Sequence, residues 1–295
     1  MGYLALSVEL DGQEPDDAEA ACFAAGAVSV TLTDAVDDAI LEPAPGEVRL
    51  WPHTVLQALF PAEAAGPEAI LALAGALQLP AASIRAERIA DRVWEREWLK
   101  DFHAMRFGRR LWVVPNHEPA PAGADSVMVR LDPGLAFGTG THPSTALCLT
   151  WLDSRLGAGD RVIDYGCGSG VLGVAAAKLG AREVHAFDID PQALIATRDN
   201  AAANEVTACV QVHEAAGSLP QQVDIVMANI LAGTLVELAP ALCGHLRPGG
   251  QIVLAGILKQ QVHEVRAGFA RFIDLAIFGE RDGWSALAGV APAQA

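Results

Sequence analysis

The stretch that decides the fold is RVIDYGCGSGVLG, residues 161–173. A short apolar run ends at Asp164, and a helical run rich in alanine follows the turn. Between them glycine occupies every second position, at Gly166, Gly168 and Gly170. A strand, a glycine turn and a helix N-terminus form a site for a nucleotide-containing cofactor, because glycine permits the tight turn and the helix start offers N–H groups. A dinucleotide site favours G-x-G-x-x-G, whereas this chain places an acid two residues before G-x-G-x-G.

Strand-like and helical runs alternate from this stretch to the C-terminus. This alternation predicts an α/β fold with a parallel, Rossmann-like sheet and helices on both faces. A turn at Arg281-Asp282-Gly283 predicts a terminal antiparallel hairpin. We expect strands at 162–165, 184–190, 208–212, 223–230, 251–257, 272–280 and 284–290, and helices at 191–205, 234–246 and 259–270, the second of them ending before Pro248-Gly249-Gly250.

The N-terminal third predicts a separate small unit with the order strand, helix, strand, strand, helix, strand. That order is typical of the ferredoxin-like α+β fold, and it carries no catalytic constellation, which favours a docking role. The unit's predicted elements lie at 3–10, 15–26, 28–32, 47–51, 67–79 and 84–90, with an irregular stretch at 52–66.

The proposed domain boundaries follow from the elements beyond this unit. We expect residues 1–91 to form the ferredoxin-like domain, 92–104 a charged linker helix with Trp94 and Trp98 four residues apart, and 105–295 the domain that contains the glycine turn. This last domain opens with predicted strands at 107–115 and 127–133 and a helix from about 144 to 152.

Composition narrows the classes of protein and partner. The chain has 295 residues, 52% of them hydrophobic, and no apolar run near the roughly 20 residues that span a bilayer. Five scattered cysteines without a C-x-x-C pair, and an N-terminus without a signal peptide, predict reduced thiols and a cytoplasmic location. Eight dispersed histidines predict no metal site. The net charge is −16, with 11 acids and one base in residues 1–50, which disfavours nucleic acid. The acidic segment fits a basic protein partner or a solubilising face equally well.

Two polar residues at predicted strand ends are candidate site residues. Ligands of such sheets lie beyond the carboxyl ends of the strands. Asp188 ends the second strand, where a carboxylate can bind both hydroxyls of a ribose. Asn229 ends the fourth strand, and a buried amide there needs a partner that an active site supplies. Asp190 is expected to cap a helix rather than to contact a ligand. Cys167 is expected to serve as a small residue between two glycines rather than as a nucleophile.

Several runs of the chain resemble one family. DPGLAFGTGTHPSTALCL, VIDYGCGSGVLG, FDIDPQAL, VMANILAG and WEREWLKDFHAMRFG together resemble the ribosomal protein L11 methyltransferases, the PrmA family, across essentially the whole chain. The resemblance implies a substrate-recognition domain before a class I methyltransferase domain that uses S-adenosyl-L-methionine. It implies methylation of lysine ε-amines and the N-terminal α-amine of ribosomal protein L11, up to trimethylation. It also implies that Thr145, Gly166, Gly168, Asp188 and Asn229 contact the cofactor or the amine, with Asn229 the catalytic residue.

The expected reaction is direct displacement, in which a neutral amine attacks the methyl carbon in line. For His142, packing in its loop or a hydrogen bond to the cofactor is favoured over a role as general base. A glutamine methyltransferase of release factors is one alternative, but it should have Asn-Pro-Pro-Tyr where residues 229–232 read Asn-Ile-Leu-Ala. A binding module that has lost activity and a nicotinamide enzyme are further alternatives. We expect a monomer with a basic ribosomal protein as its partner and no bound nucleic acid or membrane.

Overall fold

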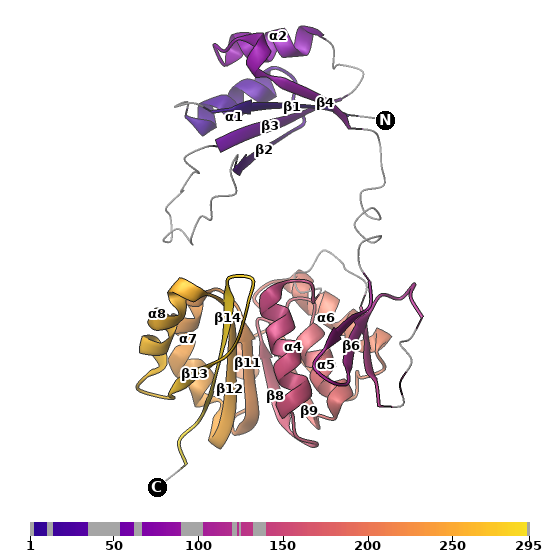
Figure 1. Cartoon of the computed structure of the whole chain (residues 1–295), viewed down its shortest axis with the longest axis vertical. Helices are drawn as coiled ribbons and strands as arrows, with labels where there is room; N and C mark the ends of the chain where they lie inside the picture. Colours follow the sequence, from indigo (N-terminus) through magenta and orange to yellow (C-terminus); the bar gives the residue numbers. More distant parts are fainter. Residues whose placement is uncertain are drawn as a thin grey trace. The chain divides into compact units, whose positions relative to one another are not determined.

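The computed structural model describes residues 3–10, 14–34, 54–61, 67–89, 103–119, 123, 125–131 and 140–293. The chain divides into two compact units, Met1–Trp98 and Leu99–Ala295. Figure 1 shows both units, coloured along the sequence.

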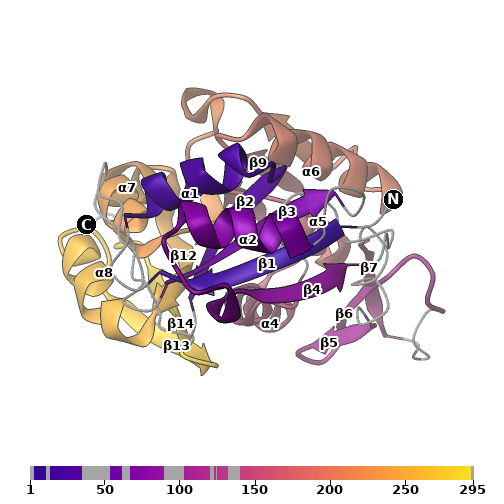
Figure 2. The ribbon, with the colours of Figure 1, turned by 90° about the horizontal axis from the view of Figure 1, so that it is seen from above.

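The first unit is a four-stranded antiparallel sheet with two helices on one face. The strand order is β2-β3-β1-β4, and α1 and α2 lie side by side over the sheet (Figure 2). Leu6, Leu56 and Phe60 point to the helix side and are almost fully buried, so they form the centre of this core. The order of elements confirms the ferredoxin-like prediction. The elements are β1 Tyr3–Glu9, α1 Pro15–Ala24, β2 Ser29–Asp34, β3 Thr54–Pro61, α2 Pro67–Ala76, a 3₁₀ turn at Ala81–Ser83 and β4 Arg85–Ile89.

A strand occupies part of a stretch that was predicted to be irregular. Residues 52–66 were expected to be irregular, yet β3 occupies Thr54–Pro61 and pairs with both β1 and β2. Burial along β3 alternates residue by residue, but Val55 and Leu59 on the less buried face are also apolar. The sequence pattern therefore lacks the polar alternation that marks a strand. The strand expected at 47–51 lies outside the described residues.

The second unit begins with a small three-stranded sheet, β5 Met105–Phe107, β6 Leu111–Val114 and β7 Val127–Arg130. The single strand predicted at 107–115 is wrong, because a turn at 108–110 divides it. The carboxylate of Asp153, on α4 (Pro143–Arg155), accepts the backbone N–H groups of Arg109 and Arg110. This contact spans more than 40 residues of sequence. Of the predicted linker helix, only His103 and Ala104 are described, and neither is helical.

The main sheet has seven strands in the order β10-β9-β8-β11-β12-β14-β13. All strands are parallel except β14, which pairs antiparallel with both β12 and β13 and so confirms the predicted hairpin. Helices α4, α5 and α6 pack on one face and α7 and α8 on the other (Figure 1). The remaining bounds are β8 Arg161–Tyr165, α5 Val171–Leu179, β9 Glu183–Phe187, α6 Pro191–Ala203, β10 Val210–His213, β11 Val223–Asn229, α7 Ala232–Gly244, β12 Leu246–Leu258, α8 Val262–Phe269, β13 Leu275–Arg281 and β14 Trp284–Val290.

One boundary of the main sheet differs clearly from the prediction. Pro248-Gly249-Gly250 was expected in a loop, but β12 starts before it, at Leu246. In the pairing of β11 with β12, Val223 lies opposite Leu246 and, after an irregularity, Ile225 lies opposite Gln251. The two strands therefore pair on both sides of Pro248-Gly249-Gly250, and β12 runs through these residues. Within the described residues, no helix is long and apolar enough to cross a membrane.

Candidate active site

The glycine turn between β8 and α5 is folded back onto β9. Gly166, Gly168 and Gly170 have φ values of 76°, 53° and 76°, which side chains other than glycine rarely adopt. The N–H groups of Gly166 and Cys167 both donate to the carbonyl of Phe187, at 2.8 and 3.0 Å. These two hydrogen bonds to the end of β9 fix the backbone of the turn.

Asp188 lies immediately after β9, and backbone groups hold its carboxylate. Oδ2 accepts the N–H of Gly168 at 2.9 Å and Oδ1 accepts the N–H of Asp190 at 3.0 Å. Each oxygen keeps a second lone pair that can accept a hydroxyl proton. The next residue, Ile189, is apolar and yet 90% exposed. A fixed carboxylate beside an exposed apolar side chain matches a group that has vicinal hydroxyls and a flat ring.

Asp190 caps a helix, as the sequence predicts. It is the N-cap of α6, and its Oδ1 accepts the N–H of Gln192 at 2.9 Å. Cys167 also fits its structural reading, because burial raises the pKa of its thiol and so disfavours the nucleophilic thiolate. The hydroxyl of Thr197 donates to Cys167 Sγ at 3.2 Å.

Asn229 and Thr145 form the second half of the site. Asn229 is the last residue of β11, and Thr145, in the first turn of α4, is 1% exposed. The amide Nδ2 of Asn229 donates to Thr145 Oγ1 at 3.1 Å, across 84 residues of sequence. This hydrogen bond fixes the amide plane and directs Oδ1, an acceptor, away from Thr145.

His142 caps the helix that carries Thr145. Its Nδ1 lies 2.7 Å from Ser144 Oγ and accepts the N–H of Ser144. Its ring meets the ring of Trp284 edge to face, with centroids 4.6 Å apart. Burial lowers the pKa of His142 and so favours the neutral ring. These contacts indicate a structural role for His142, which caps α4 and packs against Trp284.

Asp164 is a site residue whose role sequence reasoning did not identify. It is 1% exposed, and its Oδ2 accepts the N–H of Gly173 at 2.8 Å. Its Oδ1 is buried and has no hydrogen-bond partner among the described residues. Burial raises the pKa of Asp164 to about 7, an effect that the Gly173 N–H opposes and the charge of Asp188 reinforces. The acid before the first glycine was visible in the sequence, but its burial was not.

The two halves of the site meet at Ile230. The Cγ2 methyl of Ile230 fills the space beside Gly166, where an added Cβ would lie 2.3 Å from it. One cluster thus consists of Gly166, Gly168 and Asp188, and we call it the Asp188 cradle. The other consists of Thr145 and Asn229, and Ile230, the residue after Asn229, connects the two. Among the described residues, no three His, Cys, Asp or Glu side chains are grouped so as to hold a metal ion.

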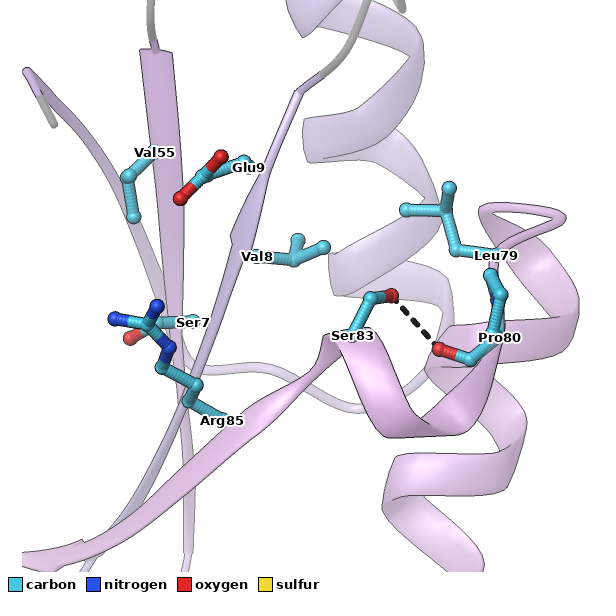
Figure 3. Close-up of a pocket in the computed structure, with 8 residues that line it drawn as sticks. All are labelled: Ser7, Val8, Glu9, Val55, Leu79, Pro80, Ser83 and Arg85. Atoms are coloured by element: carbon cyan, nitrogen blue, oxygen red, sulfur yellow. Dashed lines mark hydrogen bonds between the residues drawn. The ribbon is translucent and has the colours of Figure 1, made fainter.

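A separate pocket of about 390 Å³ lies in the first unit (Figure 3). The exposed side chains of Glu9 and Arg85 flank one part of it, and Leu79 and Pro80 form another part. Ser83 Oγ donates to the carbonyl of Pro80 at 2.7 Å and keeps the wall formed by the 3₁₀ turn in place. The lining thus combines an acid and a base with an apolar wall.

Comparisons with known proteins agree on one family. A family model described as "Ribosomal protein L11 methyltransferase (PrmA)" matches residues 2–292. Proteins named ribosomal protein L11 methyltransferase from Pseudomonas aeruginosa and Alkalilimnicola ehrlichii are each 48% identical to this chain over 292 residues. These matches cover 98% of this chain, and 98% and 99% of the relatives. A solved structure, a ribosomal protein L11 methylase from Lactobacillus delbrueckii subsp. bulgaricus, has a TM-score of 0.60 and 32% identity. It covers 65% of this chain and all of that one.

Proposed function

The chain belongs to the ribosomal protein L11 methyltransferase (PrmA) family, and on that premise we propose that it methylates amines of ribosomal protein L11. It is an S-adenosyl-L-methionine-dependent protein methyltransferase. The proposed acceptors are lysine ε-amines and the N-terminal α-amine, each taking up to three methyl groups. The observation that carries the proposal is the site in which the Asp188 cradle and the Asn229–Thr145 pair meet at Ile230.

The residues of the cradle fit S-adenosyl-L-methionine. The carboxylate of Asp188 would bind the two ribose hydroxyls, and Ile189 would pack against the adenine ring. Gly166 and Gly168 would let the backbone approach the cofactor closely. The carboxyl group of Asp164 is buried at this end of the sheet, and a bound cation would favour its charged form. When bound, the cofactor supplies a methyl group activated by a sulfonium.

Asn229 would orient the acceptor amine. Its Nδ2 is committed to Thr145, so Oδ1 can accept an N–H from the incoming amine and hold the nitrogen lone pair in line. Only a neutral amine can attack, and an unperturbed lysine has a pKa of about 10.4. His142 is committed to its helix cap and to Trp284. We therefore assign the proton of the ammonium to water and give His142 no role as base.

Substrate docking is assigned to the first unit. We propose a substrate-recognition domain at 1–91, a linker at 92–104 and a methyltransferase domain at 105–295. The acidic N-terminal segment complements a basic ribosomal protein. A monomer that binds no nucleic acid fits this arrangement. A fragment that starts near Arg92 should keep cofactor binding but lose methylation of the protein; equal methylation by fragment and full chain would contradict the assignment.

The test of the function is transfer of labelled methyl groups to purified ribosomal proteins, followed by mass mapping. Label should appear on amines of L11 alone. Label on release-factor glutamine would support the glutamine alternative, and no label on any protein would support an inactive binding module. Asn229→Ala should lower kcat by about 10²-fold through loss of orientation. Its affinity for the cofactor should stay within threefold of the wild type.

A further inference from the structure

Strand β12 departs from regular pairing beside the Asn229 turn. β11 and β12 stay in register up to the pair Asn229–Ala255. The next residue of β12, Gly256, has a φ of +81°, and the pairing of β12 with β14 shifts between Leu254 and Ile257. This is a β-bulge at the carboxyl edge of the sheet, where ligands of parallel sheets bind.

The bulge brings the backbone of β12 against the backbone of Ile230. A Cβ at Gly256 would lie 2.3 Å from the carbonyl oxygen of Ile230, 2.9 Å from its carbonyl carbon and 3.2 Å from its nitrogen. These are backbone atoms, so no side-chain rotation can relieve the contact. On its other side, the Cγ2 methyl of Ile230 fills the space left by Gly166. Ile230 is therefore held between two glycines, an arrangement that we call the Ile230 clasp.

The clasp acts on Asn229 through the chain. Asn229 precedes Ile230, and Leu231, which follows, is the N-cap of α7. A shift of a few tenths of an ångström at Ile230 must therefore move the amide that is expected to orient the amine. We propose that Gly256 is a positioning residue for methyl transfer, because the lack of a side chain there lets β12 fix the turn that carries Asn229. This inference rests on the proposed function.

The same bulge also bears on the partner of Asn229. Past the shift, Leu258 pairs with Trp284, whose ring meets His142, the N-cap of the helix that carries Thr145. Both ends of the Asn229–Thr145 hydrogen bond are thus supported from one irregularity in β12. The cofactor site touches the clasp at Gly166, but its backbone is also held by the contacts of Asp188 and Phe187 with the turn. A substitution at Gly256 should therefore lower kcat much more than it lowers the affinity for the cofactor.

The test is Gly256→Ala in the full chain, with Gly159→Ala as the matched control. Gly159 has a similar φ of +88°, but nothing lies within 4 Å of an added Cβ there, so this variant isolates the backbone strain from the steric contact. For Gly256→Ala we expect kcat on L11 to fall by 10-fold or more. Its Kd for S-adenosyl-L-methionine, measured by calorimetry, should stay within threefold of the wild type. Gly159→Ala should keep the wild-type kcat.

The outcomes separate the two proposals. If the wild type itself does not methylate L11, the proposed function fails. If the wild type is active and Gly256→Ala keeps kcat within twofold, the positioning role is wrong, and so it is if kcat and cofactor affinity fall together. Should Gly256→Ala not fold, Ile230→Ala opens the clasp from the Gly166 side and should give the same split. A wild-type kcat in that variant would overturn the inference.

Discussion

The carboxylate of Asp188 is expected to contribute most of the affinity that this site has for the ribose. Its two oxygens are fixed by the N–H groups of Gly168 and Asp190 at 2.9 and 3.0 Å, so little ordering is required on binding. A hydrogen bond to a charged group contributes about 1.5–3 kcal/mol. Since Asp188 is partly exposed, we take the lower figure for each of two ribose hydroxyls. Their loss amounts to about 3 kcal/mol, or roughly a 10²-fold weaker Kd.

The assay is titration calorimetry of S-adenosyl-L-methionine with Asp188→Ala and Asp188→Asn. The alanine variant should bind roughly 10²-fold more weakly. The asparagine variant keeps one acceptor oxygen without the charge and should lie between the alanine variant and the wild type. The matched control is Asp190→Ala, which loses the cap of α6, about 1 kcal/mol of stability, but no ligand contact.

Two results would refute this reasoning. One is a Kd for Asp188→Ala within threefold of the wild type in a variant with a native circular dichroism spectrum. The other is an equal loss of affinity in Asp190→Ala, which would trace the effect to the helix start and not to the carboxylate.

Four further predictions concern the pH dependence of cofactor affinity, the pH dependence of stability, the contacts of Asp153 and the need for a metal. Because the cofactor is a cation and burial raises the pKa of Asp164 to about 7, cofactor affinity should fall as the pH drops below 7, and Asp164→Asn should flatten that dependence in calorimetry. The stability of the cofactor-free protein should change with pH in the opposite direction. Protonated Asp164 stabilises the folded state at low pH, and this stability is lost as the pH rises through about 7. Thermal melts from pH 5 to 8 would detect the loss. Asp153→Ala leaves the N–H groups of Arg109 and Arg110 without their buried acceptor and should cost about 3 kcal/mol in urea unfolding; a change under 1 kcal/mol would contradict the anchoring role. Methyl transfer should continue in excess EDTA, and inhibition that zinc or magnesium reverses would reveal a metal that the chain was not expected to bind.

The sequence predicted the main sheet better than the first unit. In the main sheet, strands such as β8 and β11 are largely buried and contain short apolar runs, Val162-Ile163 in β8 and Ile225–Ala228 in β11. In the first unit, β3 carries apolar residues on its less buried face too, and its period of two was hidden. The division between β5 and β6 was missed because the carboxylate that fixes the turn belongs to a helix more than 40 residues later.

The candidate site shows the same division between local and distant contacts. The positions of Asp188 and Asn229 at the carboxyl edge were predictable, because parallel strands bring their ends to one side of the sheet. Their partners were less so. Thr145 was expected at the site from the family resemblance, but its hydrogen bond to Asn229 joins residues 84 apart. The role of Ile189 rests on its 90% exposure, which no sequence pattern predicts for an isoleucine.

By itself, the sequence determined the glycine turn and the sheet around it. The alternating glycines, the strand before them and the helix after them are local features whose conformation depends on near neighbours. Only the tertiary structure decided how the reacting end of the site is held. The burial of Asp164 and the clasp of Ile230 between Gly166 and Gly256 depend on strands that meet only after folding. Close packing between distant segments leaves no short-range pattern in a sequence, so the fold alone sets it.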